Sequence, residues 1–165
     1  QEELFKSVNF FEADSFNLAL YGVNGEYGLL DIIDIYSSSP AGNLANYYAG
    51  ISFLNIGDNE SAVDYLSAFS SDDEVVSSIA IGSMGDAYMN MGEFDDAINF
   101  WTKAAFNSEN NFTKPLYLKR AAIALEEKGD IDRAIEYYDT IKRNYSNSEE
   151  ARDIEKFIFR AKLKQ

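Results

Sequence analysis

An eleven-residue phrase occurs four times in this chain, and this repetition constrains the fold more than any other feature of the sequence. The clearest copies are MGEFDDAINFW at residues 91–101 and KGDIDRAIEYY at residues 128–138. Looser copies are IGDNESAVDYL at residues 56–66 and NGEYGLLDIID at residues 24–34. Aligned on their glycines, Gly25, Gly57, Gly92 and Gly129, the copies lie 32, 35 and 37 residues apart. A period of this length indicates a stacked array of helix pairs.

Each letter that the copies share has a physical role in a helix–turn–helix unit. The glycine can adopt the left-handed conformation that ends a helix. The acidic residue after it meets the positive end of the next helix dipole, at Glu26, Asp58, Glu93 and Asp130. A small residue then allows two helices to approach closely, at Ala62, Ala97 and Ala134, and a large residue follows on the same face, at Leu66, Trp101 and Tyr138. Seven residues before the glycine is a second small residue, at Gly50, Gly85 and Ala122.

The pattern predicts three regular helix pairs and a less regular first pair. The regular pairs are expected at residues 42–56 with 59–69, 74–91 with 94–107, and 115–128 with 131–144. A degenerate pair is expected at residues 4–21 with 26–37. The last helix begins after Ser148, and its apolar side chains fall on one face while its basic side chains face water. We interpret it as a helix that caps the last repeat, the alternative being a basic amphipathic membrane helix.

The sequence resembles the tetratricopeptide repeat (TPR) family. The residues that carry the resemblance are Gly50, Phe53, Gly57, Ala62 and Leu66 in one copy, Gly85, Tyr88, Gly92, Phe94, Ala97, Trp101 and Ala104 in the next, and Ala122, Leu125, Gly129, Ile131, Ala134 and Tyr138 in the third. The first helices depart from the family by having Asn46, Ile81 and Leu118 where Trp is usual. The resemblance implies an all-α, right-handed solenoid of antiparallel helix pairs, with about nine helices and a C-terminal capping helix.

The predicted organisation is a single TPR-like domain over residues 1–165. It consists of a degenerate N-terminal helix pair at residues 1–40, three TPR units at residues 41–146 and the capping helix at residues 147–165. With 165 residues, 46% of them hydrophobic, the chain is long enough to bury a substantial core.

The composition argues against several functions. The chain has no Cys and no His, which excludes thiolate nucleophiles, imidazole bases and Cys/His zinc sites. Its net charge is −14, whereas nucleic-acid binding needs clustered Lys and Arg. The carboxylate pairs, such as Asp31 with Asp34, are best interpreted as solvated acidic surface, and the glycines are spread along the chain rather than gathered in a phosphate loop. We therefore expect no enzyme, no metal, no cofactor and no nucleic-acid partner.

The acidic charge is concentrated in one part of the chain. Residues 1–111 contain 2 basic and 18 acidic side chains, a net charge of −16, whereas residues 112–165 contain 12 basic and 10 acidic ones, a net charge of +2. A solvated surface is the simpler interpretation. The alternative is that the acidic part attracts cationic partners.

The family resemblance places binding on the first helices of the units. It implies a concave groove that holds a protein or peptide segment, and the candidate groove residues are Tyr47, Asn55, Asp86, Asn90, Lys119 and Glu126. Asn55, Asn90 and Tyr47 could bond a peptide backbone, while Asp86 and Glu126 could hold a Lys or Arg. We expect a non-enzymatic interaction module, with a structural, self-associating helical repeat as the alternative, so homo-oligomerisation stays open.

The sequence also resembles bacterial envelope TPR proteins that have one membrane span and an external repeat domain and are associated with the secretion translocon. The phrases that carry this resemblance are FFEADSFNLAL at residues 10–20, AGNLANYYAGISFLNIGD at residues 41–58 and ARDIEKFI at residues 151–158. Residue 1 is Gln rather than Met, so an anchor can precede this sequence in the natural protein. The resemblance implies a domain outside the cytoplasm, anchored to the cytoplasmic membrane and linked to protein secretion or assembly, with a cytoplasmic location as the alternative.

Overall fold

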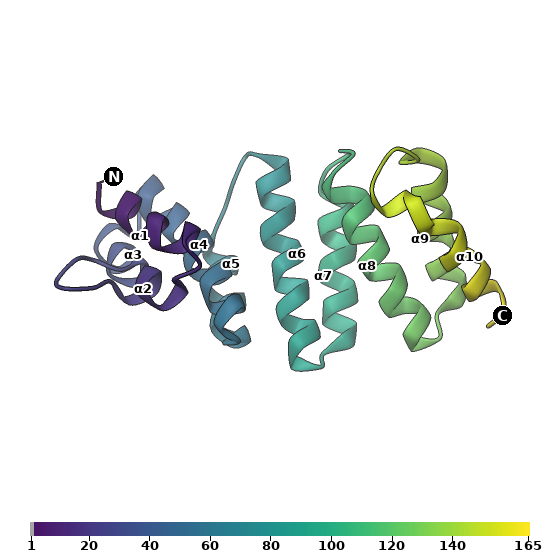
Figure 1. Ribbon diagram of the computed structural model, residues 1–165, viewed down its shortest axis with the longest axis horizontal. Helices are drawn as coiled ribbons and strands as arrows, with labels where there is room; N and C mark the ends of the chain where they lie inside the picture. Colours follow the sequence, from purple (N-terminus) through teal and green to yellow (C-terminus); the bar gives the residue numbers. More distant parts are fainter. Residues whose placement is uncertain (1) are drawn as a thin grey trace. The chain divides into compact units, whose positions relative to one another are not determined.

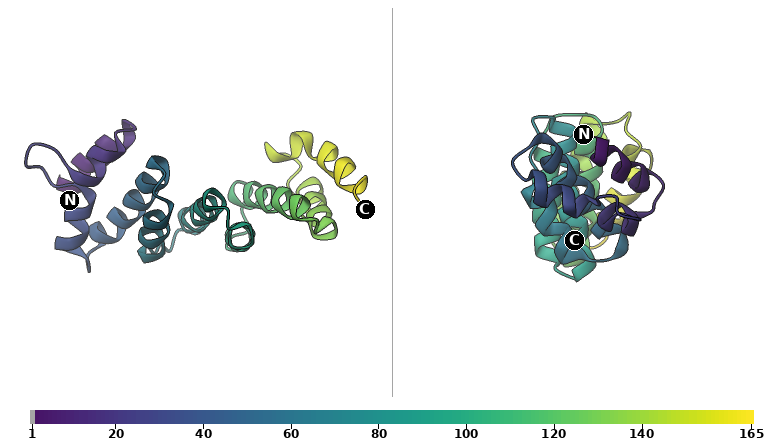
Figure 2. Two further views of the ribbon diagram at one scale, coloured as in Figure 1. Left: turned by 90° about the horizontal axis from the view of Figure 1, so that it is seen from below. Right: turned by 90° about the vertical axis from the view of Figure 1, so that its left-hand side faces the viewer.

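The computed structural model describes residues 2–165, which form ten α-helices and one 3-10 helix without a strand (Figures 1 and 2). This confirms the predicted all-α class. Gln1, the first residue of the predicted domain, lies outside the described residues. The chain divides into two compact units, unit 1 at Gln1–Ser71 and unit 2 at Asp72–Gln165. The assignment of all 165 residues to a single domain stays a prediction.

Unit 1 contains five helices, of which α1, α2 and α3 all contact α4. Their bounds are α1 (Glu2–Glu12), α2 (Phe16–Tyr21), α3 (Leu29–Tyr36), α4 (Pro40–Ile56) and α5 (Asn59–Ala68). Helices α4 and α5 form the first regular pair, within two residues of the predicted bounds. Pro40 occupies the first position of α4, where a helix needs no N–H donor.

The start of unit 1 is less regular than the sequence suggested. A single helix was expected at residues 4–21, but the chain breaks after Glu12, and Asp14 adopts the left-handed conformation with φ of 53°. The chain resumes as α2 at Phe16, and the helix expected at residues 26–37 begins at Leu29, because the Asp31 carboxylate accepts the N–H of Gly28 at 3.0 Å and caps it. The prediction that Glu26 starts this helix is therefore wrong. Glu26 lies in the preceding loop and pairs with Lys6 at 3.3 Å.

Unit 2 contains the other two regular pairs and the C-terminal segment. Its elements are α6 (Glu74–Met91), α7 (Phe94–Phe106), α8 (Thr113–Lys128), α9 (Ile131–Asn144), the 3-10 helix η1 (Glu150–Asp153) and α10 (Ile154–Lys162). Helix α10 packs on α9 and buries Ile154, Ile158 and Ala161, which confirms the capping helix. None of the helices in residues 2–165 combines the length and apolarity that a membrane span requires.

The turns between paired helices use the predicted glycines. Gly57, Gly92 and Gly129 have φ values of 86°, 81° and 91°, and each N–H bonds the last turn of the preceding helix. An L side chain is strained in this conformation, so glycine is the residue that ends these helices at lowest cost.

The small residues within the first helices accept large residues from the second helices. A Cβ atom at Gly50 would lie 2.5 Å from Leu66 Cγ, and one at Gly85 would lie 2.6 Å from Trp101 Cδ1. Both distances are shorter than real side-chain contacts. The absence of a side chain is thus what allows these helices to approach, as the repeat pattern predicted.

The first helix of unit 2 depends on its N-cap. Asp73 accepts the N–H groups of Val75 and Val76 at 2.9 and 3.0 Å. Because this satisfies two donors that the helix itself cannot pair, we expect Asp73→Ala to lower the free energy of unfolding by about 1 kcal/mol. Urea denaturation monitored by circular dichroism measures this change. The neighbouring exposed Asp72, replaced by Ala, is the matched control and should change stability little; equal losses in the two variants would refute the capping role.

Candidate functional site

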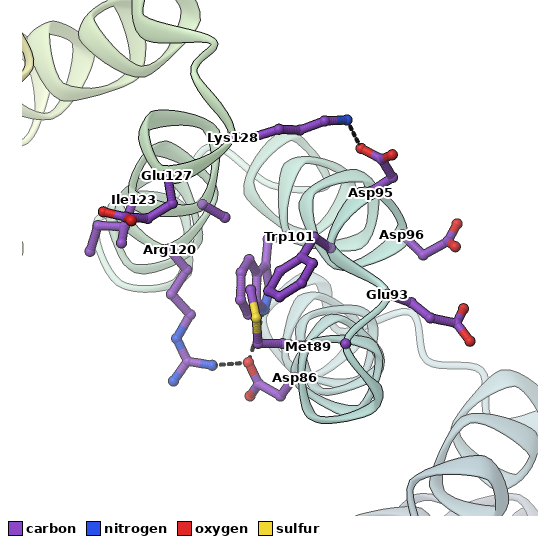
Figure 3. Close-up of a pocket in the computed structure, with 13 residues that line it drawn as sticks. Asp86, Met89, Glu93, Asp95, Asp96, Trp101, Arg120, Ile123, Glu127 and Lys128 are labelled. Atoms are coloured by element: carbon purple, nitrogen blue, oxygen red, sulfur yellow. Dashed lines mark hydrogen bonds and ion pairs between the residues drawn. The ribbon is translucent and has the colours of Figure 1, made fainter. Parts of the chain in front are cut away.

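Unit 2 has an open pocket of about 880 Å³ between α6, α7 and α8 (Figure 3). It lies near the Gly92 turn and the C-terminal end of α8. The pocket residues are Asp86, Met89, Gly92, Glu93, Phe94, Asp95, Asp96, Trp101, Arg120, Ile123, Ala124, Glu127 and Lys128. Its size falls in the range of about 300–1,000 Å³ that is usual for binding pockets.

The interior of the pocket is mostly apolar. Trp101 and Met89 lie at its centre in Figure 3, and Ile123 and Phe94 add apolar surface. Trp101 is only 6% exposed, whereas Phe94 is 57% exposed. The Trp101 Nε1–H donates to Asp86 Oδ1 at 2.9 Å, so the indole ring is fixed in place. A rigid indole beside an accessible phenyl ring gives the pocket a surface suited to a large apolar group.

The charges around this interior are predominantly negative. Five carboxylates and two cations line the pocket, so the lining has a net charge of −3. Both cations are paired within it, Arg120 with Asp86 and Lys128 with Asp95. The other three carboxylates, Glu93, Asp96 and Glu127, are exposed, and Glu127 has Lys164 at 3.8 Å. The pocket therefore combines an apolar interior with carboxylates that face solvent.

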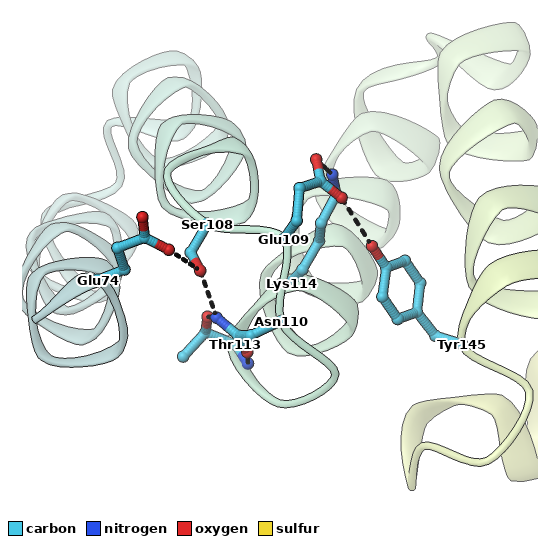
Figure 4. A network of polar contacts seen from close by, with 7 residues as sticks. All are labelled: Glu74, Ser108, Glu109, Asn110, Thr113, Lys114 and Tyr145. Atoms are coloured by element: carbon cyan, nitrogen blue, oxygen red, sulfur yellow. Dashed lines mark hydrogen bonds and ion pairs between the residues drawn. The ribbon is translucent and has the colours of Figure 1, made fainter.

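A polar network fixes the loop that joins α7 to α8, at the end of these helices away from the pocket (Figure 4). Ser108 donates to Glu74 at 2.8 Å, and Asn110 donates to Thr113 at 2.6 Å. This network connects the start of α6 to the start of α8 through the loop. It therefore helps to fix the spacing of two of the helices that form the pocket.

The same loop also contacts the end of α9. Buried Lys114 pairs with Glu109, and the Tyr145 hydroxyl donates to the same carboxylate at 3.2 Å. The hydrogen bond from Lys114 holds the pKa of Glu109 below its usual value, against the opposing effect of burial. The loop is thereby joined to both α8 and α9.

Two of the predicted binding residues, Tyr47 and Asn55, lie on α4 in unit 1. Tyr47 is half-buried, with its ring 5.6 Å from Tyr48 and 5.1 Å from Phe69, and burial raises its pKa. Asn55 is exposed, and its side chain donates to Ile51 O on the same helix at 2.8 Å. Neither residue lines the unit 2 pocket, and their predicted role in binding stays a prediction.

Asp86 and Asn90 lie on α6 in unit 2. Asp86 lines the pocket, as a groove residue should, but its carboxylate is bound to Trp101 and Arg120 of the same chain. Asn90 is exposed one residue beyond Met89 and is not part of the pocket lining. Of the six predicted residues, Asp86 is the one that the structure places in the pocket.

Lys119 and Glu126 lie on α8 and contact the C-terminal segment. Lys119 Nζ lies 2.5 Å from an Asp153 carboxylate oxygen and 4.7 Å from the centre of the Phe157 ring. Glu126 is 2% exposed and pairs with Arg160 at 2.7 Å and Lys164 at 2.8 Å. Glu126 thus holds basic side chains, as its predicted role requires, but these belong to its own chain.

The environment of Glu126 changes its acidity. Burial acts to raise its pKa, but hydrogen bonds from Arg160, Lys164 and Tyr138 outweigh that effect and lower the pKa to about 2. Tyr138 donates its hydroxyl to this carboxylate at 3.0 Å, and burial, followed by this bond, raises the tyrosine pKa. Glu126 is therefore ionised at neutral pH and fixes α10 to α8.

Several pocket residues were not in the predicted set, notably Phe94, Trp101 and Lys128. Trp101 was expected as the large residue that packs against a small one in the repeat, and it is buried, but it also lines the pocket. One sequence signal could have indicated the difference between the two pairs of unit 2. Met89 stands three residues before Gly92, where Glu126 stands three residues before Gly129, so the same place in the unit is apolar in one pair and charged in the next.

No metal-binding arrangement accompanies the pocket. Across residues 2–165, no three Asp or Glu side chains are grouped so that they could hold a metal ion, and the sequence has no Cys or His.

The chain was compared with protein families, curated proteins and solved structures. A family described as a domain of unknown function (DUF6340) matches residues 83–164, which fall in unit 2. No curated protein matches the chain in sequence.

Among solved structures, the chain is similar to TPR-like repeats described as those of a kinesin light chain from Podosopora anserina. One structure has a TM-score of 0.68 at 11% identity and covers 99% of this chain and 85% of that one. A single-substitution variant of it has a TM-score of 0.68 at 12% identity and covers 99% and 84%. At this identity the likeness concerns the fold alone. The chain therefore has the TPR-like helical-repeat fold that its sequence predicted.

Proposed function

We propose that this chain is a non-enzymatic interaction module that holds a segment of a partner protein in the pocket between α6, α7 and α8. The observation that carries the proposal is the exposed, partly apolar surface around Trp101 and Phe94, held by three packed helices. Phe94 is more than half exposed. Ile131, the residue at the equivalent position of the next helix pair, is instead partly buried against the core. An accessible aromatic side chain beside a preformed pocket is typical of interaction sites.

We further propose that the protein and its partner lie in the bacterial cell envelope. The phrases at residues 10–20, 41–58 and 151–158 resemble those of bacterial envelope TPR proteins, so the partner would be a protein of the envelope, in secretion or assembly. Protease protection in spheroplasts, using the natural gene product with an epitope tag, tests the location. Digestion from outside supports the envelope assignment, whereas protection until lysis supports the cytoplasmic alternative.

Site-specific photo-crosslinking tests the binding function. The photoreactive residue p-benzoylphenylalanine would replace Phe94 in the full-length natural protein, expressed in its own cells. We expect ultraviolet light to give one or a few defined adducts with another protein, identified by mass spectrometry, because Phe94 is accessible and lies in the pocket.

Phe112 provides the matched control position. It is 65% exposed, lies in the α7–α8 loop and is not a pocket residue. The proposal requires that the adducts at Phe94 be absent at Phe112. An identical adduct pattern at both positions, or no adduct at Phe94, would reject binding in this pocket.

A further inference from the structure

The two helix pairs of unit 2 differ in how the space above them is filled, and this difference indicates what the pocket binds. In the pair α8–α9, Glu126 binds Arg160 of α10 and Lys164, which follows α10. The Phe157 ring of α10 lies 5.5 Å from the Tyr138 ring on α9. A helix of this chain that carries cations and an aromatic ring therefore already packs on one pair of unit 2.

The pair α6–α7 is covered by α8, whose Arg120 binds Asp86 as Arg160 binds Glu126, but an open pocket remains between these three helices. Aligned on the turn glycines, Met89 takes the place of Glu126, and Trp101 takes the place of Tyr138. Asp86, the carboxylate beside the indole ring, is already paired with Arg120. The interior instead offers Met89, Trp101 and Phe94 to an apolar group.

The carboxylates lie outside this apolar interior. Glu93 and Asp96 project toward solvent from the start of α7 in Figure 3, and within residues 2–165 neither has an ion-pair partner. Glu127 is 72% exposed on the α8 side of the pocket. A ligand with cations on both sides of its apolar group would face these carboxylates without displacing the Arg120–Asp86 and Lys128–Asp95 pairs.

We propose, on the basis of the proposed binding function, that the pocket takes a basic protein segment in which a large aliphatic or aromatic side chain is flanked by Lys or Arg. The apolar side chain packs against Trp101 and Phe94, and the cations face Glu93, Asp96 and Glu127. The apolar contact provides most of the affinity, and the charges provide selectivity and faster association.

Trp101 gives a direct readout, because it is the only Trp in the chain and it forms part of the pocket. The probe is a synthetic amphipathic peptide of Lys, Leu and Phe without Trp. We expect it to cause a saturable change in Trp101 fluorescence and to shift the indole N–H resonance in NMR spectra. A peptide with Glu in place of Lys, and one with Ala in place of Leu and Phe, should each bind at least ~10-fold more weakly.

Two surface variants locate the binding. Phe94→Ser should weaken the Lys–Leu–Phe peptide by about 10-fold, because it removes an apolar contact from the pocket. The double variant Glu93→Lys and Asp96→Lys should weaken binding and reduce its dependence on salt concentration. Phe112→Ser and Glu136→Lys, both exposed in unit 2 and outside the pocket, are the matched controls and should leave binding unchanged.

Four outcomes would overturn the inference. If the Glu peptide bound as tightly as the Lys–Leu–Phe peptide, recognition would not depend on positive charge. If the Ala peptide bound as tightly, recognition would not depend on an apolar side chain. Equal loss in the Phe112→Ser control would place binding elsewhere. Concentration-dependent self-association in analytical ultracentrifugation that Phe94→Ser abolishes would identify a second copy of the chain as the occupant.

The test also separates this inference from the proposed function. If Phe94 crosslinks to a protein in cells but the Lys–Leu–Phe peptide leaves Trp101 unchanged, the pocket binds a protein of different chemistry, and only the inference fails. If Phe94 forms no adduct in cells while the peptide binds as expected, the recognition chemistry stands and the proposed cellular role fails.

Discussion

Glu126→Gln is expected to lower the free energy of unfolding by about 2–3 kcal/mol at pH 7. The substitution keeps the shape of the side chain but removes the negative charge that pairs with Arg160 and Lys164. The breaking of a buried ion pair from one side costs about 3–5 kcal/mol. The loss should be smaller here, because Arg160 and Lys164 are 43% and 42% exposed and can turn toward water. Urea denaturation followed by circular dichroism measures the change.

Glu127→Gln is the matched control for this variant. Glu127 precedes the same turn on the same helix, but it is 72% exposed and lies 3.8 Å from Lys164. Because exposed ion pairs contribute about 0–1 kcal/mol, this variant should stay close to the wild type in stability. If the two variants lost stability equally, the effect would come from overall charge rather than from the buried carboxylate.

The contribution of Glu126 should depend on pH in a defined direction. Its pKa is about 2 in the folded protein, below the value of about 4.3 for an unfolded chain. A lowered folded pKa gives stability that is fully present above the unfolded pKa and is lost as the pH falls toward the folded pKa.

The difference in unfolding free energy between the wild type and Glu126→Gln should therefore be constant from pH 7 to about pH 5 and shrink below about pH 4. Urea unfolding of both proteins across this pH range checks the prediction. The effects of the other carboxylates cancel in the difference, because these groups titrate alike in both proteins. A difference that stayed constant down to pH 2, or grew, would contradict an ionised Glu126 as the source of the stability.

The helix pairs were predictable from the sequence because local physics determines them. Gly57, Gly92 and Gly129 end their helices through a backbone conformation that glycine adopts at little cost. The close approach at Gly50 and Gly85 depends on pairs of positions at fixed spacing, so it repeats visibly in the letters. Such spacing can be recognised in the sequence without knowing how the helix pairs pack on one another.

The partners of the long charged side chains were not predictable in the same way. Asp86 and Glu126 were both expected to face a ligand, yet Arg120 and Arg160, each 34 residues further along the chain, reach them. Both separations are close to the repeat period, so each ion pair joins successive units, but the letters alone do not show which carboxylate a flexible Arg side chain reaches. The break near Asp14 was not predicted because the residue with positive φ there is Asp rather than glycine, so no glycine marks the end of the helix.

The pocket was missed because it arises from what each helix pair leaves unfilled. The sequence places Trp101 and Tyr138 at the same position of the repeat, and both are buried. Both rings donate to a carboxylate, Tyr138 to Glu126 and Trp101 to Asp86, but a pocket opens beside Trp101. Equivalent letters can therefore give a filled site in one pair and a pocket in the next.

Gly85→Ala is expected to lower the free energy of unfolding by about 2 kcal/mol, although alanine favours a helix over glycine by about 1 kcal/mol. The new methyl group would lie 2.6 Å from Trp101 Cδ1, and the indole ring is fixed by its bond to Asp86. Trp101→Tyr alone should cost a similar amount, because it loses contacts and that hydrogen bond. Chemical denaturation of each variant gives both values.

The double variant tests whether these two positions interlock. Gly85→Ala with Trp101→Tyr recreates the pair Ala122 and Tyr138, which the chain already uses between α8 and α9 with both residues fully buried. Since the smaller ring leaves room for the methyl group, the double variant should be more stable than the sum of the single losses predicts, by about 1 kcal/mol or more. Gly129→Ala provides the control, because a Cβ there meets open space and its cost should simply add to that of Trp101→Tyr. Simple additivity at Gly85 as well would mean that small and large residues at matched intervals do not set the helix spacing.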